Sequence, residues 1–102
     1  MRIVLKAKLN EVQEVTETDN HKRQRIVLNV PVYDTFTGEK VRDQIFPATI
    51  LNDNIIKLQA QEKLGEIVKC TCFLGSFKTE KDDKIYWNLS LNCIEMEIIK
   101  TD

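Results

Sequence analysis

Only one histidine, His21, occurs in this sequence, and the cysteines number three. A structural metal site takes four ligands, usually from paired cysteines and histidines. Cys70 and Cys72 form a Cys-x-Cys pair, but no second cysteine pair completes a tetrahedral set, so we expect neither a metal nor another cofactor. The sequence also lacks a glycine-rich phosphate loop and a Ser-His-acid arrangement. We therefore do not expect an enzyme.

Long apolar runs are also missing. The first ten residues contain three consecutive apolar residues before Lys6, which is too few for a signal peptide or a membrane span. The sequence thus predicts a cytoplasmic protein without membrane contact. Cys70, Cys72 and Cys93 all fall on predicted core positions of strands, as expected of buried thiols in a reducing compartment.

Neither sign of charge is in excess. Fifteen basic and sixteen acidic residues give a net charge of −1, whereas proteins that hold duplex DNA through its phosphates are distinctly basic. Single-strand binding needs less positive charge, because bases also stack on aromatic rings. With 102 residues, of which 42% are hydrophobic and 30% charged, the chain is predicted to form one globular domain over residues 1–102.

Strict alternation of apolar residues predicts a long hairpin over residues 66–99, with its turn at 79–84. The core-facing positions would be Val68, Cys70, Cys72, Leu74, Ile85, Trp87, Leu89, Leu91 and Cys93. Phe73, Phe77, Tyr86, Asn88, Ser90 and Asn92 would point away. After Cys93 the apolar phase shifts to Ile94, Met96 and Ile98, which indicates a β-bulge.

Three further strands are predicted before this hairpin. They cover residues 2–15, with a bulge near Asn10, and residues 25–33 and 41–50. Residues 16–24 are polar throughout and predict a loop. Pro31 and Pro47 cannot donate a ladder hydrogen bond, which indicates edges or irregularities there.

One helix is predicted, over residues 52–64. Asn52 or Asn54 would cap its first turn, Leu51 would pack on Ile56, and Gly65 would end it. Its apolar stripe would close one end of a barrel.

This order of elements is that of the OB-fold, an all-β fold with one helix: a five-stranded Greek-key barrel with the helix between strands 3 and 4. Another small α+β roll would have the same order, because strand order does not fix pairing. The segments QIFPATILNDNIIKLQ, KCTCFLGSF and IYWNLSLNCIEME resemble those of compact single-stranded-DNA-binding OB-fold proteins of bacteria and phages. The chain differs from the bacterial housekeeping members in lacking a glycine-rich linker and an acidic tail.

OB-folds bind oligonucleotides on the face of strands two and three and on the flanking loops. The predicted phosphate contacts are Lys22, Arg23, Arg25, Lys40, Arg42, Lys78 and Lys84. The predicted stacking rings are Tyr33, Phe73, Phe77 and Tyr86. The basic residues could instead simply solvate a loop or a turn, and the rings could form a dimer interface. Trp87 and Phe46 are interpreted as core residues.

Two functions are compatible with these features. The first is non-catalytic binding of single-stranded DNA or RNA, with little sequence preference, by a homo-oligomer that supports replication or recombination. The alternative is a protein-interaction or assembly module, such as a structural component of a phage or mobile element. The near-zero net charge and the polar residues Asn88, Ser90 and Asn92 favour the alternative.

Overall fold

Strands dominate the computed structural model, which describes residues 1–99. Residues 100–102, the end of the predicted domain, lie outside the described residues. The elements in chain order are β1 (Arg2–Val12), β2 (Thr16–Thr18), β3 (His21–Tyr33), β4 (Lys40–Leu51), α1 (Asp53–Leu58), a 3₁₀ turn (Ala60–Lys63), β5 (Ile67–Lys81) and β6 (Lys84–Ile98).

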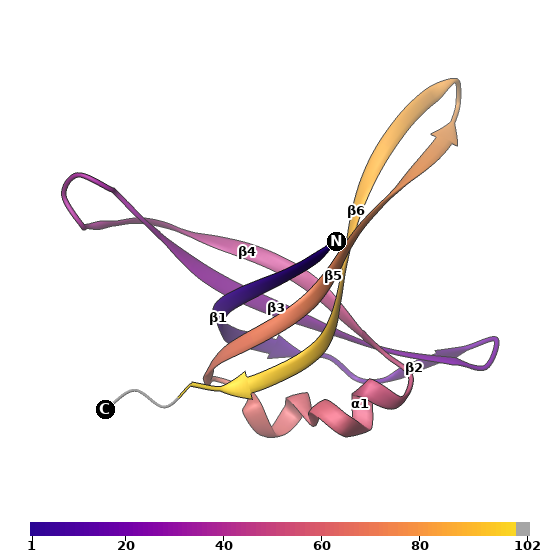
Figure 1. The fold of residues 1–102 in the computed structure, drawn as a ribbon. Coiled ribbons are helices and arrows are strands. Elements are labelled where there is room, and N and C mark those ends of the chain that lie inside the picture. The colour runs from indigo at the N-terminus through magenta and orange to yellow at the C-terminus, as the bar shows by residue number, and fades with distance from the viewer. Residues whose placement is uncertain (100–102) are drawn as a thin grey trace.

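The strands form one sheet that closes on itself (Figure 1). Its order is β1-β5-β6-β4-β3-β2, and β1 also pairs with β3, so that five strands make a barrel to which β2 is added. The pairings are antiparallel except for a short parallel contact between Thr49 of β4 and Asn92 of β6. The predicted OB-fold is confirmed, with the helix after the third barrel strand.

The predicted loop over residues 16–24 is wrong, because these residues form a hairpin. Thr16 pairs with Arg23 and Thr18 with His21. Asp19 and Asn20, at φ 48° and 68°, make a two-residue turn with both residues left-handed, the geometry that matches the twist of a hairpin. Asp and Asn tolerate this conformation better than most residues, so a wholly polar segment can form a hairpin.

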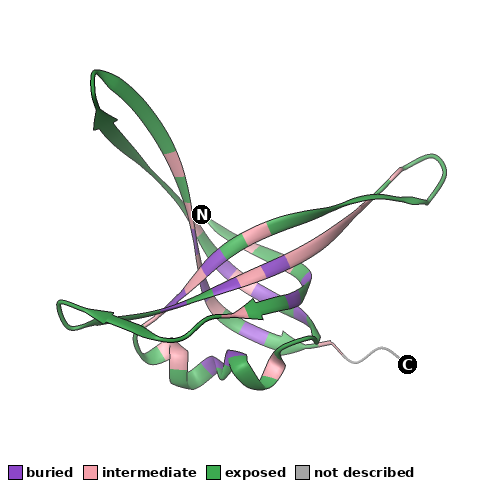
Figure 2. Cartoon of the chain, turned by 180° about the vertical axis from the view of Figure 1, so that it is seen from behind, coloured by how far each residue is buried: buried purple, intermediate pink, exposed green. Residues whose placement is uncertain are grey.

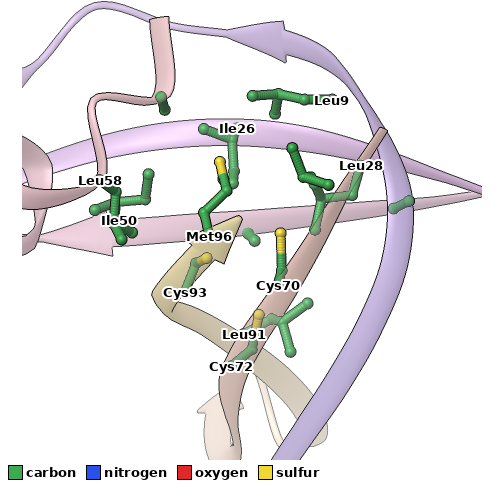
Figure 3. Packing of buried hydrophobic residues seen from close by; sticks show 14 residues of the cluster. Leu9, Ile26, Leu28, Ile50, Leu58, Cys70, Cys72, Leu91, Cys93 and Met96 are labelled. Atoms are coloured by element: carbon green, nitrogen blue, oxygen red, sulfur yellow. The ribbon is translucent and has the colours of Figure 1, made fainter. Parts of the chain in front are cut away.

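The core lies inside the barrel, as the alternation predicts (Figure 3). Its buried side chains are Ala7, Leu9, Ile26, Leu28, Ala48, Ile50, Leu58, Ala60, Val68, Cys70, Cys72, Leu91, Cys93 and Met96. Both predicted bulges are present. One interrupts the β1–β3 register between Leu9 and Glu11, and the other leaves Ile94 unpaired opposite the step from Thr71 to Cys72.

The helix is shorter than predicted. Gln59 adopts a left-handed conformation with φ 47°, which ends α1 at Leu58 and leaves a 3₁₀ turn to continue the segment. Asn52 provides no side-chain cap. Its Oδ1 instead accepts a hydrogen bond from the backbone N–H of Lys22 at 3.0 Å, which ties the start of the helix to β3. Leu58 is buried against the barrel while Ile56 is exposed.

Gly65 has φ +86° and donates a backbone hydrogen bond to the carbonyl of Leu9 at 2.8 Å. A Cβ at this position would meet nothing within 4 Å, so a substitution is penalised through the backbone alone. Gly65→Ala should lower the free energy of unfolding by about 1–2 kcal/mol, measured by urea unfolding. Gly65→Asn should lose less, because Asn tolerates this conformation. An unchanged unfolding midpoint in Gly65→Ala would contradict the assignment.

The β5–β6 and β3–β4 hairpins extend far beyond the barrel, and the shorter β2–β3 hairpin projects beside the helix (Figures 1 and 2). Register pairing of β5 with β1 stops at Phe73, and β4 touches β6 at Asn92. Leu74 still donates a backbone hydrogen bond to the carbonyl of Met1 at 2.7 Å, so residues 75–90, the β5–β6 arm, pair only with one another. In the same way, pairing of β3 with β1 stops at Asn29, which leaves residues 30–44 as the β3–β4 arm. Pro31 lies in this arm, where its strand has a free edge, as predicted.

The interpretation of Trp87 as a core residue is wrong. Ile85, Trp87 and Leu89 are 55%, 75% and 77% exposed, although their alternation with outward residues is as predicted. Because they lie on the arm, no second layer of the barrel covers them. Phe46, which lies nearer the barrel, is partly buried and packs against the core.

Candidate nucleic-acid interface

One face of the β5–β6 hairpin carries three aromatic side chains. We call it the ring face and define it by Phe73, Phe77, Lys81, Lys84, Tyr86 and Asn88. Phe77 pairs with Asn88, and Tyr86 with Thr79, so Phe77 and Tyr86 are diagonal neighbours on the same side of the hairpin, within reach of each other's rings. Phe73, Phe77 and Tyr86 are 43%, 54% and 49% exposed. The rings are therefore available to a ligand.

Positive charge lies at both ends of this face. Lys81 and Lys84 pair with each other at the tip. At the barrel end, the Arg2 guanidinium lies 5.3 Å from the centroid of the Phe73 ring, directly opposite it in the β1–β5 register. Arg2 is not among the predicted site residues, because its position over Phe73 depends on the pairing of two strands distant in sequence.

Lys78 does not lie with the rings. It pairs with Trp87 in the register, on the other side of the arm. Its Nζ contacts a carboxylate oxygen of Glu80 at 2.9 Å. The structure thus places Lys78, a predicted phosphate contact, on the face of the arm opposite the rings.

A second candidate surface is a groove of about 600 Å³ on the outside of the barrel, between β1 and the β3–β4 arm. Its lining includes Lys6, Lys8, Asn29, Pro31, Tyr33, Lys40, Asp43 and Ile67. Tyr33 and Lys40 oppose each other in the register, so two predicted site residues meet here. Lys6 and Lys8 are additional cations that alternate with core residues along β1.

The charge of Lys40 is shared with a neighbouring carboxylate. Its Nζ lies 2.7 Å from Asp43 Oδ1, and this hydrogen bond lowers the pKa of Asp43. Asp43 is therefore ionised at neutral pH and offsets Lys40. The free positive charge of the groove consequently comes from Lys6 and Lys8.

The remaining predicted cations are divided between two faces. Arg23 and Arg25 are exposed on the outward face of β3, the face that continues to Tyr33. Lys22 has the opposite phase and lines a hollow with Asn52, Asp53 and Ile55 at the start of the helix. Arg42 pairs with Val32 rather than with Tyr33, so it too lies on the other side of its arm.

Strand β1 connects the two surfaces. It lies between β3 and β5 in the closed barrel, and its outward residues are Arg2, Val4, Lys6 and Lys8. Lys8 adjoins Asn29 beside the groove, and Arg2 adjoins Phe73 on the ring face. A row of cations thus runs along the outside of the barrel between Tyr33 and the three rings.

This surface has the means to bind an anionic, base-containing chain. Exposed rings stack on bases, and lysine and arginine side chains contact phosphates. Among residues 1–99, no group of three or more His, Cys, Asp or Glu residues is arranged to hold a metal ion. Within the same described range, no helix is long and apolar enough to cross a membrane.

Comparison with solved structures finds the same fold over nearly the whole chain. The mitochondrial single-stranded DNA binding protein Rim1 from S. cerevisiae aligns with a TM-score of 0.70 and 15% identity, covering 100% of this chain and 97% of that one. The small single-stranded DNA-binding protein from Streptomyces coelicolor aligns with a TM-score of 0.64 and 9% identity, covering 97% and 94%.

A dimeric structure of the N-terminal domain of PriB from Thermoanaerobacter tencongensis aligns with a TM-score of 0.60 and 19% identity, covering 98% of this chain and 97% of that chain. No protein-family model and no curated protein matches the sequence. At these identities the likeness establishes the OB-fold of this chain.

Proposed function

We propose that this protein binds single-stranded nucleic acid, primarily DNA, without catalysing a reaction and with little sequence preference. The observation that carries the proposal is the continuous outer surface on which the cations of β1 join the Tyr33 groove to the ring face. Cations in line with exposed rings are what single-strand binding requires. That three proteins of the same fold are named for single-stranded DNA binding or as PriB supports the proposal.

On this proposal, the bases stack on Tyr33, Phe73, Phe77 and Tyr86. Phosphates contact the outward-facing cations Arg2, Lys6, Lys8, Arg23, Arg25 and Lys84. Lys22, Arg42 and Lys78 face other directions, and we expect them to contribute little. Lys40 orders the groove through its ion pair with Asp43.

The biological setting that we propose is replication or recombination in the cytoplasm, carried out by a single OB-fold domain. Stacking accepts every base, since each base has an aromatic face, which suits a protein that covers exposed strands of any sequence. The three buried thiols are unpaired, as expected in a reducing compartment.

The test is the salt dependence of binding to oligo-dT of about 30 nucleotides, long enough for several OB-fold sites. If each of the six cations named above contacts one phosphate, the affinity should fall on the order of three-hundredfold between about 50 and 200 mM salt, as measured by fluorescence anisotropy. A duplex of the same length should compete poorly. Absence of binding at the lower salt, or binding indifferent to salt, would contradict the proposal.

A further inference from the structure

The face of the β5–β6 arm opposite the rings is apolar and uncovered. We call it the apolar face and define it by Ser76, Lys78, Glu80, Ile85, Trp87 and Leu89, which the register places together. Its three hydrophobic side chains are each more than half exposed. In Figure 2 the outer part of the arm is exposed, away from the barrel. Contiguous exposed apolar side chains mark a surface for association.

The charges on this face do not favour nucleic acid. Its single cation, Lys78, is paired with Glu80 at 2.9 Å, which leaves the face without net charge. Lys81 and Lys84 at the tip belong to the ring face instead. A phosphate on the apolar face would therefore meet a carboxylate together with the lysine, and so the chemistry of this face fits a protein surface.

We propose that a second copy of this chain packs on the apolar face, arm against arm, about a two-fold axis. A two-fold interface is self-complementary: each residue that contacts a second residue in the other copy is matched by the reverse contact. Lys78 and Glu80 lie two positions apart on one strand and one face. Two arms related by such an axis can therefore place Lys78 of one copy against Glu80 of the other, twice.

The size of the face sets the expected strength of this dimer. Because an aromatic side chain buries 150–250 Å², Ile85, Trp87 and Leu89 together offer on the order of 400 Å² per copy. This is about half of the roughly 800 Å² per partner that a stable interface of standard size buries. The expected product is therefore a weak, reversible dimer.

Sedimentation of the protein alone tests the proposal, at about 1 to 200 µM, the range in which reversible association is observed. The wild-type protein should form dimers. Trp87→Ser should dissociate at least tenfold more readily, whereas Tyr86→Ser, on the ring face, should dimerise like the wild type. Trp87 is the only tryptophan, so its emission should shift to the blue as the protein concentration rises.

Exchange of the charges tests the two-fold axis itself. Lys78→Glu and Glu80→Lys should each weaken self-association, because like charges then face each other. An equimolar mixture of the two variants should recover dimers, since the acidic face of one is complementary to the basic face of the other. An intramolecular effect of these substitutions would not be rescued by mixing.

Three results would overturn the proposal: a wild-type protein that is monomeric at the highest concentration, a dimer that is insensitive to Trp87→Ser, or a mixture that does not associate. Quenching of Trp87 emission by oligo-dT without any change with protein concentration would assign the face to nucleic acid instead. The sedimentation and mixing experiments contain no nucleic acid. Their failure is thus distinguishable from failure of single-strand binding.

Discussion

Alanine at both Phe77 and Tyr86 should weaken the binding of oligo-dT between about thirtyfold and about twenty-thousandfold. A base stacked on an aromatic ring contributes about 1–3 kcal/mol, so that loss of two rings should cost about 2–6 kcal/mol. Both side chains are half exposed on the ring face and lie outside the buried cluster. The double variant should therefore keep its fold, as checked by circular dichroism, and lose affinity in the anisotropy titration.

Trp87→Ala is the matched control for the ring pair. Trp87 is more exposed than either ring and lies on the same arm, but on the apolar face. At a protein concentration below that of self-association, its removal should leave the affinity for oligo-dT within about threefold, because it removes no stacking partner. If Trp87→Ala loses affinity for oligo-dT while the variant with alanine at both Phe77 and Tyr86 keeps it, the assignment of the two faces is reversed.

The barrel itself is predictable from the sequence. Period-two alternation identifies which residues of a strand face a core, and Cys70, Cys72, Leu91 and Cys93 are buried as predicted. The shift of phase at Ile94 predicts the bulge for the same reason. Core residues have one physical requirement, removal from water, and this requirement is visible in the sequence.

How far the barrel extends along β5 and β6 is harder to predict from the sequence. Trp87 and Leu91 have the same phase, yet one is exposed and the other buried. The difference arises where β6 loses its neighbours at Asn92 and β5 loses β1 at Phe73. The boundary between barrel and arm is set by where β1 and β4 end their pairing with β5 and β6. The alternation of residues within the hairpin therefore does not predict it.

Some residues of the candidate site can be predicted from the pattern of their own strand, and others depend on pairing between distant strands. The outward phase of Phe73, Phe77 and Tyr86 is local and is predicted. Lys6 and Lys8 become part of a groove only because β1 pairs with both β3 and β5, a closure that involves residues distant in sequence. The alternation of these lysines with core residues is the signal that identifies them as outward-facing.

Two of the three thiols, those of Cys72 and Cys93, should make the fold sensitive to alkali. Cys70, Cys72 and Cys93 lie in the core on β5 and β6 (Figure 3). Hydrogen bonding to Cys70, together with burial, raises the pKa of Cys93 from 9.0 to about 12. Hydrogen bonding to Cys93, together with burial, raises the pKa of Cys72 as well. In the folded protein both thiols therefore hold their protons at a pH at which the unfolded chain has released its own.

A raised pKa contributes stability that is complete below the unfolded value, near pH 9.0, and is lost as the pH rises toward the folded value. Each thiol should lower the free energy of unfolding by about 1.4 kcal/mol per pH unit in that interval. At about pH 11, two units above the unfolded value, this loss amounts to about 3 kcal/mol for Cys93 alone, and Cys72 changes stability in the same direction. The protein should be markedly less stable there.

Urea unfolding between about pH 8 and pH 11, followed by circular dichroism under reducing conditions, measures this loss over the interval set by thiol ionisation. The variant Cys72→Ala/Cys93→Ala should be less stable than the wild type at pH 8, because it leaves small cavities, yet its stability should fall less steeply with pH. All other ionisable groups are common to both proteins, so their contribution cancels in the comparison. If the two proteins lose stability equally with pH, the thiols ionise as easily in the barrel as in water. That result would contradict the raised pKa values.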